Sequence, residues 1–236
     1  DTLNYVHYDI EDETTWGFLQ DCRNLFLIVP KIPNVLEHCK NFIYTAKQAG
    51  VKKIVKIGSM GSWRVIHNQI DTYIRDCGIN CISFDMSVLM NNIFTEQYIG
   101  TTLLNYRHDT PAPYLDPKAL AEAIEQAMDR EALLNFNIKA TGRFQYSIED
   151  VERILESNGY PVTCIETIHN NQLHKNAGVS ADQRLMSDIS DDYALGIYPK
   201  ISTDLSMFGV ISRSLEDFVE QDSQYFLNLQ AGDKNL

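Results

Sequence analysis

The spacing of apolar residues over positions 1–142 switches between two patterns and predicts a repeated strand–helix order. Short β-rich runs predict strands, whereas apolar positions repeated every three or four residues and closed by glycine predict helices. The predicted strands are residues 4–8, 25–30, 51–59, 79–85 and 135–142, and the predicted helices are residues 13–22, 34–50, 65–78 and 116–129. Because strands that alternate with helices form βαβ units, we expect an α/β fold with a parallel sheet covered on both faces.

The pattern changes character after residue 142. Ser147 and Asp150 form a capping-box start, which predicts a helix over 147–160. A strand over 161–168 and helices around 181–197 and 214–227 follow, separated by polar stretches. We therefore expect two parts, a core over 1–142 and a small, mostly helical C-terminal substrate or cap region over 143–236.

Composition and charge exclude several classes of protein. The 236 residues are 44% hydrophobic and carry a net charge of −12, which fits a globular protein and excludes a disordered one. The apolar runs stop well short of the ~20 residues that a membrane span needs, so we expect no membrane association. An acidic chain without a basic cluster repels phosphate backbones, so we expect no nucleic-acid partner.

The five cysteines are spread along the chain without C-x-x-C spacing. They are typical of reduced core residues, and with no signal-peptide pattern at the start they favour a cytoplasmic location. The chain begins at Asp1 and not at methionine. Either it is processed, or a further N-terminal segment precedes it.

Residues at the carboxyl ends of the predicted strands, or just beyond them, are the first candidates for ligand binding, because open parallel sheets bind ligands at that edge. They are Asp9, Ile10, Val29, Pro30, Gly58, Ser59 and Asp85. The sequence GSMGS at 58–62 matches neither G-x-G-x-x-G nor a P-loop. It is interpreted either as a phosphate loop or as a tight exit from the strand, and we favour the second.

Five stretches spread over nearly the whole chain share their order and spacing with one enzyme family. They are YDIEDETTW (8–16), VKKIVKIGSMGS (51–62), His67 with IDTYIRDCGINCISFDMSVLMNNIF (70–94), DPKALAEAIEQAMD (116–129) and SLEDFVEQDSQYF (214–226). They resemble the NmrA-like branch of the atypical short-chain dehydrogenases/reductases. The resemblance implies a Rossmann-like doubly wound parallel sheet, NAD(P) as cofactor and oxidoreductase activity.

Three departures from the family pattern bear on the function. The family's first strand, Gly-rich loop and helix would precede residue 1, so the sheet is expected to be N-terminally incomplete; NAD(P) is expected if that unit is present, and no cofactor otherwise. Asp85-Met86-Ser87 stands where the family has Arg-Pro-Gly. Tyr73 has no lysine four positions later, although relatives that lack this pair act on quinones or dyes.

Two polar residues are candidates for catalysis. His67 and Asp71 are four residues apart, so they lie on the same side of one helix. His67 is interpreted either as a general acid or as a structural histidine, and the structural role is preferred. Asp85 is the other catalytic candidate. The resemblance implies a substrate pocket lined by Trp63, Met86, Met90, Asn91 and Asn92, although Met86 and Met90 also fit core packing.

Two functions remain open at this point. One is an NAD(P)-linked reductase of a small conjugated carbonyl or quinone-type compound. The other is a cofactor-free relative, acting as a binding or regulatory protein or as a cyclase or isomerase with Asp85 or His67 as acid and base. The expected partner is a small-molecule ligand and no metal is expected, since His169 and His174 have no convergent carboxylate. A homodimer through the helix at 34–50 is a further prediction.

Overall fold

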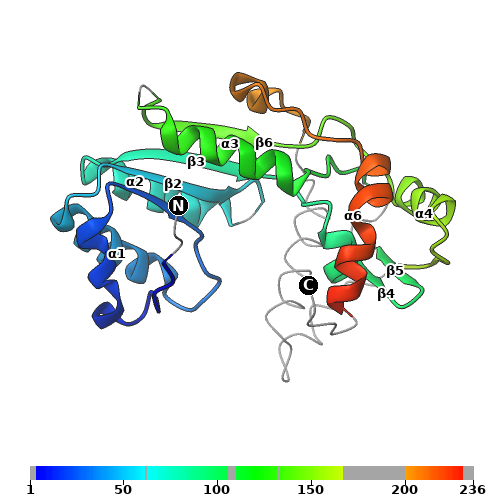
Figure 1. Ribbon diagram of the computed structural model, residues 1–236, viewed down its shortest axis with the longest axis horizontal. Helices are drawn as coiled ribbons and strands as arrows, with labels where there is room; N and C mark the ends of the chain where they lie inside the picture. The colour runs from blue at the N-terminus through cyan, green and yellow to red at the C-terminus, as the bar shows by residue number, and fades with distance from the viewer. Residues whose placement is uncertain (1–3, 62, 106–109, 132, 167–199, 231–236) are drawn as a thin grey trace. The chain divides into compact units, whose positions relative to one another are not determined.

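A computed structural model describes residues 4–61, 63–105, 110–131, 133–166 and 200–230 (Figure 1). The chain divides into two compact units. Unit 1 comprises Asp1–Ser59, Trp63–Asp85 and Ile124–Ile138, and unit 2 comprises Met60–Ser62, Met86–Ala123 and Lys139–Leu236. The predicted boundary at residue 143 stays a prediction. Among the helices of the described ranges, none is both long and apolar enough to cross a membrane.

The main sheet is parallel and has the strand order β1-β2-β3-β6. Its strands are β1 (Asn24–Leu27), β2 (Lys53–Ser59), β3 (Asn80–Met86) and β6 (Phe136–Ala140). β1 pairs with β2 in parallel, from Asn24 opposite Lys53 to Leu27 opposite Lys56. The predicted α/β class with a parallel sheet is confirmed.

Helices cover both faces of this sheet: α1 (Val35–Ala49) and α2 (Arg64–Asp76) lie on one side and α3 (Pro117–Asp129) on the other (Figure 1). Two lysines of β2 show the same division, because residues an odd number of positions apart point to opposite faces of a strand. Lys53 Nζ donates to the carbonyls of Ala127 and Met128 at the end of α3, whereas Lys56 faces α2. The two faces of β2 are therefore covered by helices on opposite sides of the sheet, as in a doubly wound fold.

The local signals in unit 1 gave two of its helices almost to the residue. Gly50 ends α1 in the left-handed region, at φ 95°, as its position predicted. The predicted helix at 13–22 is a 3₁₀ helix, η1 (Glu13–Asp21), and its cap is Asp12, whose Oδ1 accepts from the Thr14 N–H at 3.0 Å.

The strand predicted at 4–8 is wrong. These residues form no strand, and Tyr5 and Val6 are 91% and 61% exposed. Tyr8 packs instead on the rings of Phe18 and Phe42, at centroid distances of 5.7 and 5.3 Å. β-Rich composition makes a strand only where a neighbouring strand and a buried face are present, and no strand of the described residues pairs with this segment.

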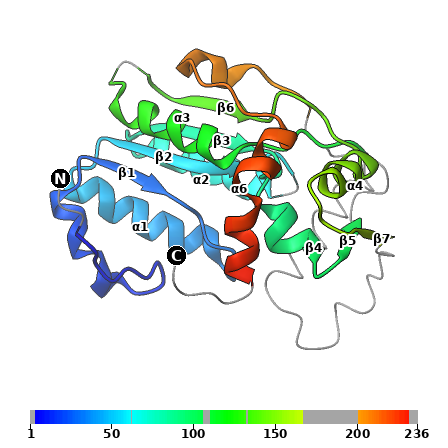
Figure 2. The ribbon, with the colours of Figure 1, turned by 45° about the vertical axis from the view of Figure 1, so that its right-hand side comes forward.

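Unit 2 contains a second, smaller sheet with the order β4-β5-β7 (Figure 2). The helices and strands of unit 2 are a short π-helix (Ile93–Gln97), β4 (Tyr98–Ile99), β5 (Thr102–Asn105), α4 (Ile148–Ser157), β7 (Thr163–Glu166), a 3₁₀ helix (Asp204–Phe208) and α6 (Leu215–Gln230). The capping box is confirmed at the start of α4: the Asp150 N–H donates to Ser147 Oγ, and the Ser147 N–H donates to Asp150 Oδ2. The elements at 93–105 were not predicted from the sequence. The helix predicted at 181–197 lies outside the described residues.

Candidate functional site

A fully buried lysine marks the centre of a polar cluster inside unit 1. Lys56, on β2, is 0% exposed. Its Nζ lies 3.0 Å from Asp71 Oδ1, 3.1 Å from Ser83 Oγ and 3.3 Å from His67 Nδ1. A buried ammonium is tolerated only where partners replace its hydration. We call Lys56, His67, Asp71, Ser83 and Asp85 the Lys56 cluster.

Backbone periodicity explains why these side chains meet. His67 and Asp71 are one helical turn apart on α2, and both face the sheet, with 8% and 1% exposure. Ser83 and Asp85 are two residues apart on β3, so they point to the same face of the sheet. The structure therefore brings both predicted catalytic residues, His67 and Asp85, into one cluster.

Asp71 is the ionic partner of Lys56. Its Oδ1 also accepts from Cys81 Sγ at 3.6 Å, and its Oδ2 accepts from Asn137 Nδ2 at 3.3 Å. Arg75 in turn donates to the Asn137 amide oxygen. His67 and Asp71, which lie on the same side of α2 as expected, both contact Lys56.

Asp85 has a different environment from Asp71. The Ser83 hydroxyl donates to its Oδ1 at 3.2 Å, and its side chain is buried. Burial raises the pKa of Asp85 above the ordinary value of a carboxyl, Asp71 raises this pKa further, and Lys56 opposes the shift. Asp85 thus keeps its proton to a higher pH than an exposed aspartate and suits a proton donor.

His67 is neutral at pH 7. Burial, and next the Lys56 ammonium, lower the pKa of His67 to about 4, while Asp71 acts in the opposite direction. A neutral imidazole has one donor nitrogen and one acceptor nitrogen. His67 is therefore a neutral hydrogen-bonding group in this cluster.

Gly58, a predicted cofactor residue, makes room for Asp85. A Cβ at position 58 would lie 2.1 Å from Asp85 Oδ1 and 2.8 Å from Ser83 Oγ. The glycine at the end of β2 thus allows the carboxyl group to approach the backbone of the neighbouring strand. This agrees with the interpretation of GSMGS as a tight strand exit.

Gly58→Ala is expected to destabilise the protein by about 1–3 kcal/mol, because the new methyl group must displace Asp85 and Ser83. Urea unfolding measures the change. Gly17→Ala is the matched control: nothing lies within 4 Å of a Cβ there, so a change within about 0.5 kcal/mol is expected. Adding Asp85→Ala to Gly58→Ala removes the closer of the two clashes and leaves the one with Ser83 Oγ, so it should restore much of the loss. A purely additive double variant would contradict the contact.

The other predicted residues of unit 1 lie outside the cluster. Asp9 is exposed in the turn before η1, where its carbonyl accepts from Trp16 Nε1 at 2.7 Å. Ile10 is a core residue, and Val29 packs partly buried against the same core. Pro30 follows β1 and Ser59 ends β2, both half-buried. Trp63 is half-buried, with Lys31 Nζ 5.1 Å from its ring centroid.

The predicted substrate residues of unit 2 have two different surroundings. Met90 is 0% exposed within the core of that unit, and Met86 is the half-buried last residue of β3. Asn91 is half-buried, and its Oδ1 has no hydrogen-bond partner. Asn92 is the residue before the π-helix Ile93–Gln97, and its side chain makes no capping hydrogen bond. Met90 therefore matches the core-packing interpretation, whereas Asn91 has an acceptor to offer.

Lys56 and Ser83 were not among the site residues predicted from the sequence. A signal was present, because Lys56 interrupts the otherwise apolar run IVKIG of a strand that was expected to be buried on both faces. Lysine is almost never fully buried unless it is paired. A charge in such a strand therefore predicts a buried partner on a neighbouring element.

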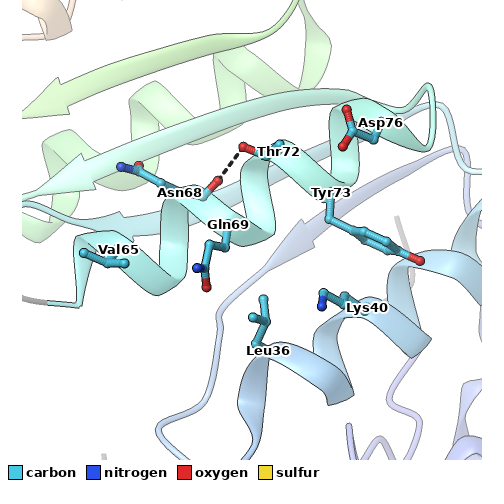
Figure 3. Close-up of a pocket in the computed structure, with 8 residues that line it drawn as sticks. All are labelled: Leu36, Lys40, Val65, Asn68, Gln69, Thr72, Tyr73 and Asp76. Atoms are coloured by element: carbon cyan, nitrogen blue, oxygen red, sulfur yellow. Dashed lines mark hydrogen bonds between the residues drawn. The ribbon is translucent and has the colours of Figure 1, made fainter.

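An open groove lies on the other side of α2, between α1 and α2 (Figure 3). Its volume is about 540 Å³. It is lined by Leu36, Lys40, Val65, Asn68, Gln69, Thr72, Tyr73 and Asp76. None of these belongs to the Lys56 cluster, since α2 turns His67 and Asp71 toward the sheet. The groove is therefore separate from the candidate site.

Comparison with known proteins gives the fold a context. No protein-family model matches the chain, and no curated protein sequence matches it. The structure is similar to an NADPH-dependent quinone oxidoreductase from Escherichia coli complexed with NADPH, at TM-score 0.75 and 18% identity, covering 93% of this chain and 82% of that chain. It is also similar to Citrobacter sp. triphenylmethane reductase complexed with NADP(H), at TM-score 0.72 and 17% identity, covering 92% and 82%.

A third similar structure belongs to another enzyme class. It is a nucleoside-diphosphate-sugar epimerase from Staphylococcus aureus, at TM-score 0.73 and 15% identity, covering 89% of this chain and 82% of that chain. At such identities the similarity establishes a Rossmann-like fold, as in NAD(P)-binding reductases, and leaves the reaction to be argued from the site.

Proposed function

We propose that this chain is an NmrA-like, NAD(P)H-linked reductase of a small conjugated carbonyl or quinone-type compound. The observation that carries the proposal is the similarity over more than nine-tenths of the chain to a quinone oxidoreductase and a triphenylmethane reductase, both complexed with the NADP cofactor. The Lys56 cluster also supports it, because it places a buried carboxyl with a raised pKa at the end of β3, at the edge of the sheet where such folds bind ligands.

The residues at this edge fit the uncharged nicotinamide end of the cofactor. Val29 and Pro30 follow β1 and Ser59 ends β2, and these three would hold the ring. Burial raises the pKa of Asp85, which favours the neutral form of this carboxyl beside an uncharged ring. The space beside Gly58 is already taken by Asp85, so Gly58 leaves the set of cofactor contacts that we propose.

The cluster supplies the proton that such a reduction needs. When bound, the cofactor supplies hydride, and the reduced carbonyl oxygen then requires one proton. Asp85 donates it as general acid, with the Ser83 hydroxyl holding its Oδ1. Neutral His67 contributes a hydrogen bond to the site and no net charge.

The test is a titration of the full-length protein with NADPH, followed by nicotinamide fluorescence, and then NADPH oxidation with a benzoquinone as acceptor. We expect saturable binding and quinone-dependent oxidation. His38→Ala, on α1 and outside the cluster, should leave both unchanged. Absence of NADPH binding at every concentration would overturn the proposal.

A second candidate, cofactor-free acid–base chemistry such as an isomerisation, is favoured by one observation. The Lys56 cluster holds a carboxyl with a raised pKa, Asp85, and a neutral imidazole, His67, and such a pair can act as acid and base without a cofactor. The same titration separates the two functions. Absent NADPH binding, together with binding of a small carbonyl compound that Asp85→Ala abolishes, would favour this candidate.

A further inference from the structure

The three N–H donors of the Lys56 ammonium are matched by three nearby polar atoms from three different residues. A lysine head group carries three N–H donors and no acceptor. Within 3.3 Å of Nζ lie one oxygen of Asp71, the hydroxyl of Ser83 and one ring nitrogen of His67. The Ile57 carbonyl is farther away, at 3.5 Å. Because Lys56 can only donate, each of these three atoms must accept.

This requirement fixes the proton on His67. Nδ1 accepts from Lys56, and a neutral imidazole carries its single proton on the nitrogen that does not accept. The tautomer is therefore the one with hydrogen on Nε2. The Nε2–H is then the donor that His67 presents away from Lys56.

The same requirement fixes the Ser83 hydroxyl and the orientation of Asp85. Ser83 Oγ accepts from Lys56, so its hydrogen is free to point to Asp85 Oδ1, 3.2 Å away. Asp85 Oδ1 is then an acceptor. When Asp85 is protonated, we place its proton on Oδ2, the oxygen that does not accept from Ser83; the Asn137 side chain is the other hydrogen-bonding neighbour of this carboxyl.

We propose that Lys56 is a positioning residue, which holds His67 as the Nε2–H tautomer and, through the Ser83 hydroxyl, directs the acidic proton of Asp85 to Oδ2. Lys56 is 0% exposed and acts only through these neighbours. As a statement about the reaction, this inference rests on the proposed function. As a statement about proton positions, it does not, and it is tested without substrate.

Every group that faces Asp85 enters the expected result. Lys56 on β2 and the Ser83 and Asn137 side chains lower the pKa of Asp85, and Asp71 on α2 raises it. His67, also on α2, is neutral and contacts Lys56. Ser83→Ala should therefore raise the titration midpoint of Asp85 alone, because it removes the link to Asp85 and leaves the contact between Lys56 and His67.

The experiment is NMR on the full chain: ¹⁵N shifts of the imidazole nitrogens give the tautomer of His67, and ¹³C shifts give the titration of Asp85. We expect Nε2–H in the wild type. Lys56→Met should raise the midpoints of both His67 and Asp85, whereas Asp71→Asn, the control of opposite sign, should lower both. If Lys56→Met fails to fold, Ser83→Ala and the wild-type tautomer decide the matter.

Two results would overturn the inference: a wild-type His67 protonated on Nδ1, or a Ser83→Ala variant in which Asp85 titrates as in the wild type. For the reaction, Ser83→Ala should lower kcat by roughly tenfold and leave KM unchanged, as expected for loss of one hydrogen bond that orients the acid. A protein with the expected NMR result but no reductase activity would refute the proposed function and keep the assignment of Lys56.

Discussion

Lys56→Met is expected to destabilise the protein by about 3–5 kcal/mol, because it leaves the Asp71 carboxylate buried without its cation. Asp71 is 1% exposed and lies 3.0 Å from Lys56 Nζ. The remaining donors, Cys81 and Asn137, are neutral and cannot balance the charge. The methionine itself fits, since it is apolar and similar in length to the lysine stem.

Urea unfolding of three variants separates charge from packing. Lys52→Met, an exposed position just before the same strand, should change the free energy of unfolding by less than about 0.5 kcal/mol. The double variant Lys56→Met/Asp71→Leu removes both charges and should recover most of the loss, because replacing a buried ion pair by apolar residues is often neutral. A single Lys56→Met variant as stable as the wild type would show that the pair is not essential to the core.

Asp85→Asn is expected to lower kcat for quinone reduction by about 10²–10⁴-fold, the usual range for removal of a general acid. Asparagine keeps the shape of the side chain and an oxygen that can accept from Ser83, so the geometry of the cluster is preserved. Stability should not fall, because burial of the carboxyl group, which raises the pKa of Asp85, is itself unfavourable to the charged form.

The pH profile identifies the role of Asp85. A general acid must be protonated, so wild-type kcat should fall as the pH rises through the raised pKa of Asp85. This limb of the profile should be missing in Asp85→Asn. Asp76→Asn, an exposed position on α2, is the matched control and should keep the wild-type profile. An Asp85→Asn variant that retains wild-type kcat would remove Asp85 from the chemistry while leaving its structural contacts in place.

Local patterns in the sequence determined most of the core. Apolar spacing gave α1, α2 and α3 together with β2 and β3, because the periods of helices and strands depend only on the backbone. Gly50 and the capping box at Ser147 marked their helix ends, since these signals act within one turn. The four-residue spacing of His67 and Asp71 correctly placed both on one face of α2.

What the tertiary structure decided concerns partners that are distant in the sequence. Residues 4–8 have the composition of a strand and form none, because no neighbouring strand of the described residues pairs with them. That Gly58 lies against the Asp85 carboxyl became visible only when β3 was placed beside β2. The sequence by itself determined the helices and strands of the core whose periodicity is strong, α1, α2, α3, β2 and β3, because periodicity depends on neighbours a few residues away. The Lys56 cluster forms only because β2 pairs with β3 and α2 packs on both strands. This packing sets the distances between the charged groups, and those distances decide which atoms carry protons.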